Sequence, residues 1–189
     1  QLDVAYFGIG PAMVARARGA DIKVVASNVI EQISVVAIGD LAAYFADGDA
    51  ATAFERFAAD QGRKPVISTF PRGSVPETVL QYWLREGLKI DPSQIEIIAQ
   101  GAAQVQQALL TGAVDGAAIL EPVVSSVLAR DPEARVVAAG SELFPNQPGA
   151  VMVVREGVLA EHRDQIAALV SAHIRATDLL VNDPEAATP

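Results

Sequence analysis

The stretch that decides the fold of this chain is residues 114–130, VDGAAILEPVVSSVLAR. A short apolar run ends at Glu121 and Pro122, and valine and leucine then recur at helical spacing. Proline is tolerated in the first turn of a helix because the N–H group that it lacks has no partner there. The stretch therefore predicts a strand over 114–119 and a helix over 121–130, which together make one α/β unit.

The same alternation of short apolar runs and helical periodicity continues along the whole chain. It predicts parallel α/β units, with helices packed on the faces of the sheet. The other predicted strands lie near 4–9, 22–27, 32–38, 65–69, 95–99, 135–139 and 150–155. The other predicted helices lie near 11–18, 50–61, 75–86, 102–111 and 159–181.

Two features predict that the chain forms two lobes. Residues 2–11, LDVAYFGIGP, repeat the order of residues 114–122, VDGAAILEP, which is aspartate, a strand and then proline. This repeat indicates two related lobes that face one another. Polar and helix-breaking residues near 60–65 and 140–149 are typical of passages between lobes. We therefore predict a first lobe over 1–61, a second lobe over 62–143, and a return to the first lobe over 144–189.

Composition excludes several functional classes. The chain has 189 residues and a formal net charge of −9, which argues against nucleic-acid binding because that needs clustered basic side chains. Cysteine is absent, which excludes a thiolate nucleophile and a sulfur-ligated metal. His162 and His173 lie on one predicted helix, about three turns apart, too far to bind one metal ion. We expect no catalytic residue, no metal and no cofactor.

Three predicted helix starts have the chemistry of an anion site. In open parallel sheets, ligands bind beyond the carboxyl ends of the strands, where free N–H groups of the following helices attract anions. Arg72 adds a guanidinium that could pair with a sulfonate, carboxylate or nitrate. The candidate ligand-binding residues are Gly10, Pro11 and Ala12, then Arg72, Gly73, Ser74 and Val75, and finally Glu121.

Each of these starts also has a purely structural interpretation. Ser74 and Glu77 fit a capping box, which stabilises a helix without any ligand. Arg72 could simply be solvated, as single loop arginines often are. Glu121 is favoured at a helix start whether or not it contacts a solute, because the helix dipole attracts a carboxylate there. Both interpretations stay open at this stage.

The order of the segments is similar to that of the nitrate/sulfonate/taurine-type (NMT1/THI5-like) periplasmic binding proteins. The resemblance implies the type II periplasmic-binding-protein fold, with two α/β lobes, two crossovers and a cleft that closes on a solute. It also implies that a strand–helix unit of the first lobe is missing at the start. Leu120 stands where the family often has an aromatic residue, and 50–61 resembles an insertion. The segments that carry the resemblance are 2–5, 8–12, 73–78, 82–88, 90–92, 95–98, 108–117 and 121–122.

The resemblance implies the extracytoplasmic solute-binding component of an ABC importer, and not an enzyme. Its solute would be a small anion such as a sulfonate, taurine or nitrate, and its protein partners would be the importer's membrane permease subunits. It would be a monomer in the periplasm, or be lipid-anchored on the outer face of the cytoplasmic membrane. Residues 10–12, 73–75 and 121 would line the cleft. Two alternatives stay open: an enzyme on the same fold that acts on thiamine-pyrimidine or menaquinone precursors, and a ligand-sensing regulatory domain.

Overall fold

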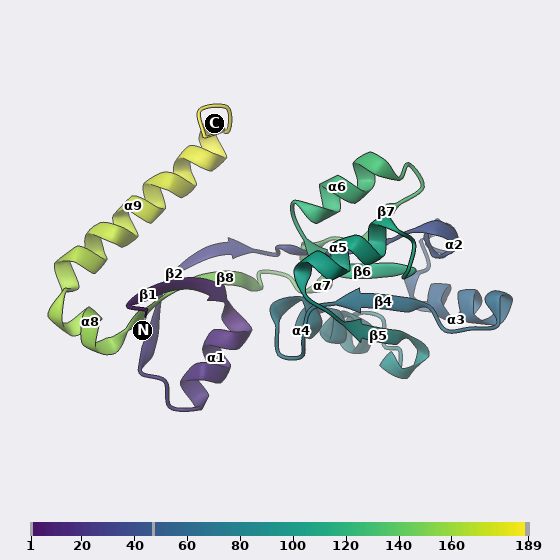
Figure 1. Cartoon of the computed structure of the whole chain (residues 1–189), viewed down its shortest axis with the longest axis horizontal. Coiled ribbons are helices and arrows are strands. Elements are labelled where there is room, and N and C mark those ends of the chain that lie inside the picture. Colours follow the sequence, from purple (N-terminus) through teal and green to yellow (C-terminus); the bar gives the residue numbers. More distant parts are fainter. Residues whose placement is uncertain (1, 47, 188–189) are drawn as a thin grey trace. The chain divides into compact units, whose positions relative to one another are not determined.

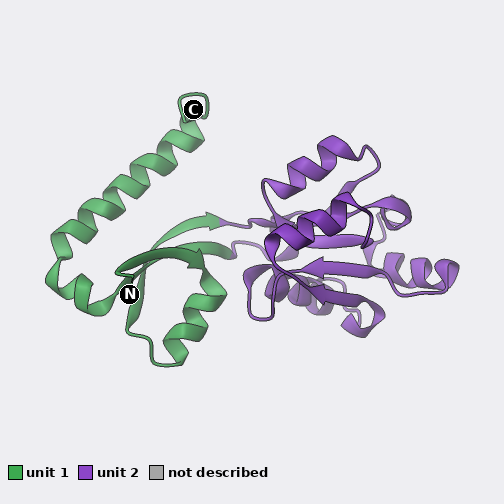
Figure 2. Cartoon of the chain, viewed as in Figure 1, with its two compact units in different colours: residues 1–29, 148–189 green, residues 30–147 purple. Residues whose placement is uncertain are grey.

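The computed structural model describes residues 2–46 and 48–187, and the chain divides into two compact units (Figures 1 and 2). Unit 1 is formed by Gln1–Val29 and Pro148–Pro189, and unit 2 by Ile30–Gln147. The second unit is thus one continuous segment inserted between two segments of the first. All eight predicted strands are present among the described residues.

Unit 1 is built on a small sheet, with one helix after its first strand and two helices after its last strand. Its elements are β1 (Val4–Gly8), α1 (Ile9–Ala17), β2 (Ile22–Ile30), β8 (Pro148–Arg155), α8 (Glu156–Glu161) and α9 (Arg163–Asn182). The strand order is β1-β8-β2, and β1 runs antiparallel to β8. Ala12 of α1 packs against Val151 and Val153 of β8, which gives this unit a small apolar core.

Unit 2 holds a five-stranded sheet of order β5-β4-β6-β3-β7. Its strands are β3 (Ile33–Ala37), β4 (Val66–Thr69), β5 (Glu96–Ala99), β6 (Gly116–Leu120) and β7 (Arg135–Ala138). Its α-helices are α2 (Gly39–Ala43), α3 (Ala50–Gln61), α4 (Val75–Tyr82), α5 (Ala102–Leu110), α6 (Val123–Arg130) and α7 (Gly140–Leu143). A π-helical turn over Trp83–Gly87 extends α4, and Pro92–Gln94 form a 3-10 turn.

The sheet of unit 2 is mixed, so the predicted parallel pairing holds for only part of it. β4 runs parallel to β5 and β6, whereas β3 is antiparallel to β6 and β7. Ile33 at the start of β3 lies opposite Leu120 at the end of β6. The chain therefore enters the unit at the carboxyl edge of the parallel strands, and it leaves at the same edge after β7. In this unit β3 runs away from that edge and β7 runs back toward it, so the sheet is mixed.

Hydrogen bonds join the entering segment of unit 2 to its leaving segment. The N–H group of Glu31 donates to the carbonyl of Gln147 at 2.9 Å, and the carboxylate of Glu31 accepts from the N–H group of Asn146 at 2.6 Å. Glu31 and Asn146 both have positive φ angles, of 52° and 59°. Gly140 packs directly on the backbone of Glu31. We call these four residues the crossover clamp.

The division between the units differs from the predicted division after residue 61. Phe54 and Phe57 of α3 are fully buried, and the rings of Phe54 and Trp83 meet edge to face with 6.1 Å between their centroids. The helix α3 therefore belongs to the core of unit 2. The polar run after Asp60 marks only the end of α3, where Gly62 adopts a left-handed φ of 66°. The second passage, between 147 and 148, lies four residues from its predicted position.

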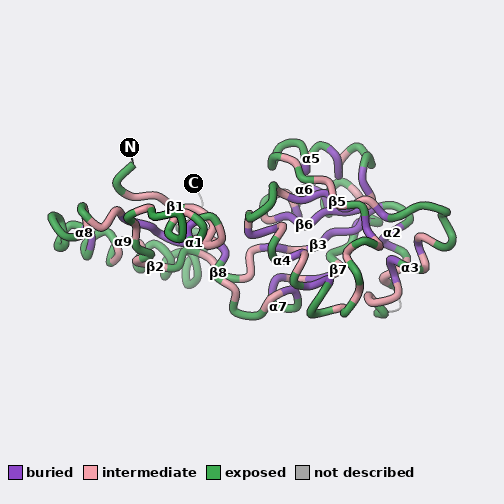
Figure 3. Tube along the Cα trace, turned by 90° about the horizontal axis from the view of Figure 1, so that it is seen from below, coloured by how far each residue is buried: buried purple, intermediate pink, exposed green. Residues whose placement is uncertain are grey.

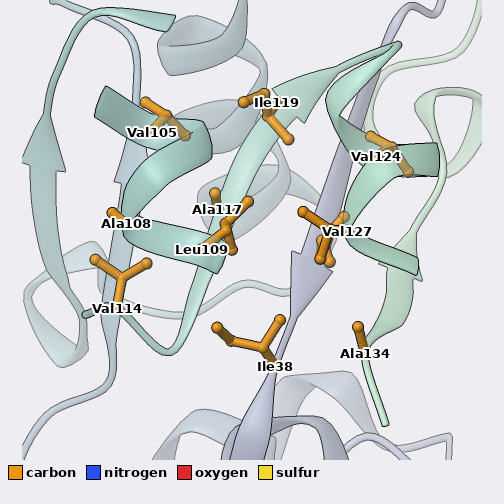
Figure 4. Close-up of a cluster of buried hydrophobic side chains, with 11 residues drawn as sticks. Ile38, Val105, Ala108, Leu109, Val114, Ala117, Ile119, Val124, Val127 and Ala134 are labelled. Atoms are coloured by element: carbon orange, nitrogen blue, oxygen red, sulfur yellow. The ribbon is translucent and has the colours of Figure 1, made fainter. Parts of the chain in front are cut away.

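Burial in unit 2 is concentrated along the sheet and under its helices (Figure 3). On one face, α5 and α6 cover Val36 of β3 and Ala117 and Ile119 of β6 (Figure 4). Their apolar side chains include Val105, Leu109, Val124 and Val127, all at most 5% exposed. This core includes residues of β4 and β6, and the candidate residues of unit 2 follow the carboxyl ends of these two strands.

The predicted helix over 159–181 is two helices in the structure. His162 separates α8 from α9 with φ −129° and ψ 40°, values that do not continue a helix. The helix restarts with the N–H group of Ile166 bonded to the carbonyl of His162. His162 and His173 therefore do not share a face of one continuous helix. No helix within residues 2–46 and 48–187 is long and apolar enough to cross a membrane.

Candidate functional site

The candidate residues of unit 1 lie at the start of α1. This helix begins at Ile9, two residues before the predicted start, and in the described chain no side chain caps it. The first N–H groups of a helix have no intrahelical partner, and Pro11 has none to offer, so Ile9 and Gly10 supply the open donors. Ala12 is only 2% exposed because its methyl group packs into the core of unit 1.

The start of α4 in unit 2 is capped by its own side chains, which confirms the structural interpretation of Ser74. Its Oγ accepts from the N–H group of Glu77 at 3.4 Å. The Glu77 carboxylate reaches back and accepts from the N–H group of Gly73 at 3.2 Å. Gly73 has a φ of 82°, a left-handed value that favours glycine. The N–H group of Ser74 donates to the carbonyl of Pro71 at 3.0 Å.

These bonds leave few donors at the start of α4. Pro76, the second residue of the helix, has no N–H group. Val75 keeps an N–H group, but the residue is only 4% exposed. The carboxylate of Glu77 also occupies the position where the helix dipole would attract an anion. A solute anion at this start therefore competes with a charge that the protein itself supplies.

Arg72 stands beside this capped start with an exposed side chain. Its guanidinium has neither a hydrogen bond nor an ion pair with any residue that the structure describes. Arginine carries five N–H donors in a planar fork that matches sulfonate, carboxylate and nitrate oxygens. Arg72 is therefore a cationic side chain of the β4–α4 loop that the described residues leave unengaged.

Glu121 precedes α6 and caps it from outside, whereas Glu77 lies inside α4 and reaches back. Its two carboxylate oxygens accept from the N–H group and from the hydroxyl of Ser125, both at 3.0 Å. The helix begins at Val123, two residues after its predicted start, and Pro122 is its N-cap. The peptide bond between Glu121 and Pro122 is cis. The carboxylate of Glu121 thus has a structural role that needs no bound ligand.

The fold brings the unit 2 candidates to one edge of its sheet. β4 and β6 are neighbouring parallel strands, so Arg72–Val75 and Glu121 both follow carboxyl ends at the same edge. Gly10–Ala12 belong to unit 1. Surface hollows of about 530 and 490 Å³ also occur in unit 2, but none of the candidate residues lines them. The larger hollow lies at the opposite edge, where Val114 and Asp115 precede β6.

Gln100, which was not among the predicted site residues, follows β5 at this same carboxyl edge. Its N–H group donates to the carbonyl of Thr69 at 2.8 Å, and its side-chain Oε1 accepts from the hydroxyl of Ser68 at 2.9 Å. A strand predicted over 95–99 and a helix over 102–111 bracket this corner. Their spacing was the signal that could have identified Gln100, because a polar residue between a strand and a helix lies at the ligand-binding edge.

Both histidines belong to unit 1. His162 is exposed between α8 and α9. His173 of α9 bonds through Nε2 to the carbonyl of Ser27 at 2.8 Å, and its Nδ1 lies 3.5 Å from the hydroxyl of Tyr6. Within the part of the chain that is described, no group of three or more His, Cys, Asp or Glu side chains could hold a metal ion.

Known structures share this fold. The aliphatic sulphonate binding protein SsuA of Escherichia coli superposes with a TM-score of 0.77 at 20% identity, over 98% of this chain and 58% of its own. The alkanesulfonate-binding protein SsuA of Xanthomonas axonopodis pv. citri, bound to MOPS, gives 0.74 at 19% identity, over 98% of this chain and 59% of its own. The nitrate-binding protein NrtA of Synechocystis PCC 6803 gives 0.72 at 18% identity, over 92% and 46%.

The chain spans less than two thirds of the length of these structures. The shared fold is α/β and is that of the periplasmic binding proteins, as the resemblance in the sequence implied. No curated protein sequence matches the chain. The family model described as the NMT1-like family matches residues 1–188. Because this match covers nearly every residue, the chain belongs to the NMT1-like family.

Proposed function

We propose that this chain is part of the extracytoplasmic solute-binding component of an ABC importer, and that its solute is a small organic or inorganic anion. The observation that carries the proposal is Arg72, an exposed guanidinium without a protein partner among the described residues, at the carboxyl edge of the parallel strands. Relatives of the same fold are described as binding sulfonates and nitrate. Both ligand classes present oxygens that match a guanidinium.

Capture without chemistry is the mechanism that this arrangement supports. Two carboxylates at this edge, those of Glu77 and Glu121, are engaged in capping their own helices. We propose Arg72 and backbone donors of unit 2 as the groups that bind the anionic head, and the open N–H group of Gly10 as a ligand donor of unit 1. Binding then shifts the protein toward whichever conformation holds the solute more tightly. The proposed partners are the importer's permease subunits, and the proposed location is the periplasm or the outer face of the cytoplasmic membrane, as a monomer.

A thermal-shift panel with nitrate, taurine and MOPS tests this function. At 100 times its dissociation constant, a bound anion is expected to raise the free energy of unfolding by about 2.7 kcal/mol. The variant Arg72→Ala is expected to lose most of that gain, because a charge-assisted hydrogen bond contributes about 1.5–3 kcal/mol. Arg72→Lys keeps the charge and is expected to lose less. A flat panel together with turnover of a thiamine-pyrimidine or menaquinone precursor would contradict the proposal and favour the enzyme alternative.

The variant Ser74→Ala separates solute binding from helix capping. The cap bond of Ser74 is long, at 3.4 Å, so its loss is expected to lower the free energy of unfolding by about 1 kcal/mol or less. If the Ser74 hydroxyl also donates to the solute, affinity is expected to fall about tenfold, which corresponds to about 1.4 kcal/mol. Isothermal titration calorimetry and chemical denaturation measure the two effects. Unchanged affinity with reduced stability would leave Ser74 only the capping role.

A further inference from the structure

We infer that Gln100 determines which chemical group the site of unit 2 accepts: its side-chain amide NH₂ donates to an oxygen of the bound anion. This inference rests on the proposed function and adds a residue that selects the solute.

Gln100 lies beside the loop that carries Arg72. In the parallel ladder of β4 and β5, Thr69 lies opposite Ala99, and the N–H group of Gln100 extends this ladder by donating to the carbonyl of Thr69 at 2.8 Å. Gln100 is therefore level with Phe70, two residues before Arg72. The backbone bond fixes the point at which the Gln100 side chain leaves the sheet.

A buried hydroxyl orients the Gln100 amide. Ser68 is 0% exposed, and its Oγ donates to Gln100 Oε1 at 2.9 Å. Its other acceptor is the carbonyl of Ile98 at 3.5 Å, a longer contact. A carboxamide has one acceptor oxygen and one NH₂ donor, so engagement of the oxygen leaves the NH₂ group as the free end. Nothing in the described chain accepts a hydrogen bond from that NH₂ group.

The other donors at this edge are largely used by the protein itself. Glu77 holds the N–H group of Gly73, and Glu121 holds the N–H group of Ser125. The Arg72 guanidinium, the Ser74 hydroxyl and the Gln100 NH₂ group therefore remain as side-chain donors at this edge. An NH₂ group donates but does not accept, so it favours sulfonate, nitrate or carboxylate oxygens and disfavours ammonium groups. Ser68 is a positioning residue, because it acts through Gln100.

Replacing Gln100 with glutamate or leucine tests the inference. Gln100→Glu exchanges the NH₂ donor for an anionic acceptor and is expected to weaken the binding of MOPS or nitrate about a hundredfold, whichever the wild-type chain binds. Gln100→Leu removes the donor without adding charge, and about a tenfold loss is expected. Isothermal titration calorimetry gives the affinities. A cooperative unfolding transition in the absence of ligand, followed by circular dichroism, shows that each variant is folded.

Two further variants serve as control and as test of the positioning role. Gln107→Glu makes the same charge change at an exposed position of α5 and is expected to alter affinity less than about twofold, since its charge is screened by solvent. Ser68→Ala frees the amide to rotate, so affinity is expected to fall about threefold to fivefold and the preference for MOPS over an amine analogue to narrow. Ser68→Thr keeps a hydroxyl at this position, so it is expected to retain more of that preference than Ser68→Ala does.

The outcomes distinguish this inference from the proposed function. A wild-type chain that binds none of the anions contradicts both. If the wild-type chain binds an anion and Gln100→Glu binds it equally well, the role of Gln100 is wrong and the proposed function stands. A large loss that appears equally in Gln107→Glu also contradicts the inference, because it would reflect net charge and not the position of residue 100.

Discussion

Replacing Gly140 with alanine is expected to lower the free energy of unfolding of unit 2 by about 3 kcal/mol or more, the upper range for overpacking. A Cβ atom at this position would lie 1.9 Å from the carbonyl oxygen of Glu31 and 2.5 Å from its carbonyl carbon. These are backbone atoms, so no side chain can rotate away to make room. The crossover clamp also keeps the Glu31 backbone from moving aside, since Glu31 is hydrogen-bonded to both Asn146 and Gln147.

Fluorescence during chemical denaturation measures this effect selectively in unit 2. Trp83, the single tryptophan of the chain, is 4% exposed and packs against Phe54 in that unit. Gly157→Ala is the matched control, because a Cβ atom there meets nothing within 4 Å and its helix α8 belongs to unit 1. That change is expected to leave the Trp83 transition where it is. If the Gly140→Ala protein unfolds at the same denaturant midpoint as the wild type, the predicted clash with the backbone of Glu31 is contradicted.

The second large effect is expected from Asp115→Ala, which should lower the free energy of unfolding by about 2–3 kcal/mol, the range for hydrogen bonds to charged groups. The carboxylate of Asp115 accepts from both terminal nitrogens of Arg63 at 2.6 Å and from the N–H group of Val66 at 2.8 Å. Its side chain is only 14% exposed. The hydrogen bond to Asp115 also raises the pKa of Arg63, whose guanidinium lies 4.9 Å from the Phe57 ring centroid.

The repeated sequence pattern supplies the control for this prediction. Asp3 occupies the equivalent position in unit 1 and bonds to Arg155 at 2.8 Å, but its side chain is 61% exposed. Exposed ion pairs contribute about 0–1 kcal/mol, so Asp3→Ala is expected to change stability little. Urea denaturation followed by circular dichroism compares the two variants. Equal losses of unfolding free energy in the two variants would mean that the bond to Val66 and the lower exposure of Asp115 add nothing to stability.

Local patterns predicted the strands and the longer helices, because these depend on the spacing of apolar residues. They did not predict α2 and α7, of five and four residues, which are too short to show a helical period. Strand direction was also missed: β3 is antiparallel to β6 because of where the chain enters unit 2, a property of the tertiary fold. The polar run after Asp60 is equally typical of a helix end and of a passage between lobes, so spacing could not decide between them.

For the candidate site, sequence spacing identified bonds between near neighbours and missed those between distant ones. The bond between Ser74 and Glu77 follows from an S-x-x-E spacing, and the structure contains it. The bond between Ser68 and Gln100 joins residues 32 positions apart on adjacent strands, so only the register of β4 and β5 reveals it. No local motif marks a glutamine at that position.

The crossover clamp also bears on how this polypeptide could be recombined. Unit 2 is one uninterrupted segment, and its first and last residues are held together by the bonds of Glu31 to Asn146 and Gln147. A segment whose ends are adjacent can be exchanged as a cassette, because the host chain needs to span only a short gap. A graft of residues 30–147 would transfer Arg72 and Gln100 together, so the solute preference that we propose for them would pass between homologues in a single genetic step.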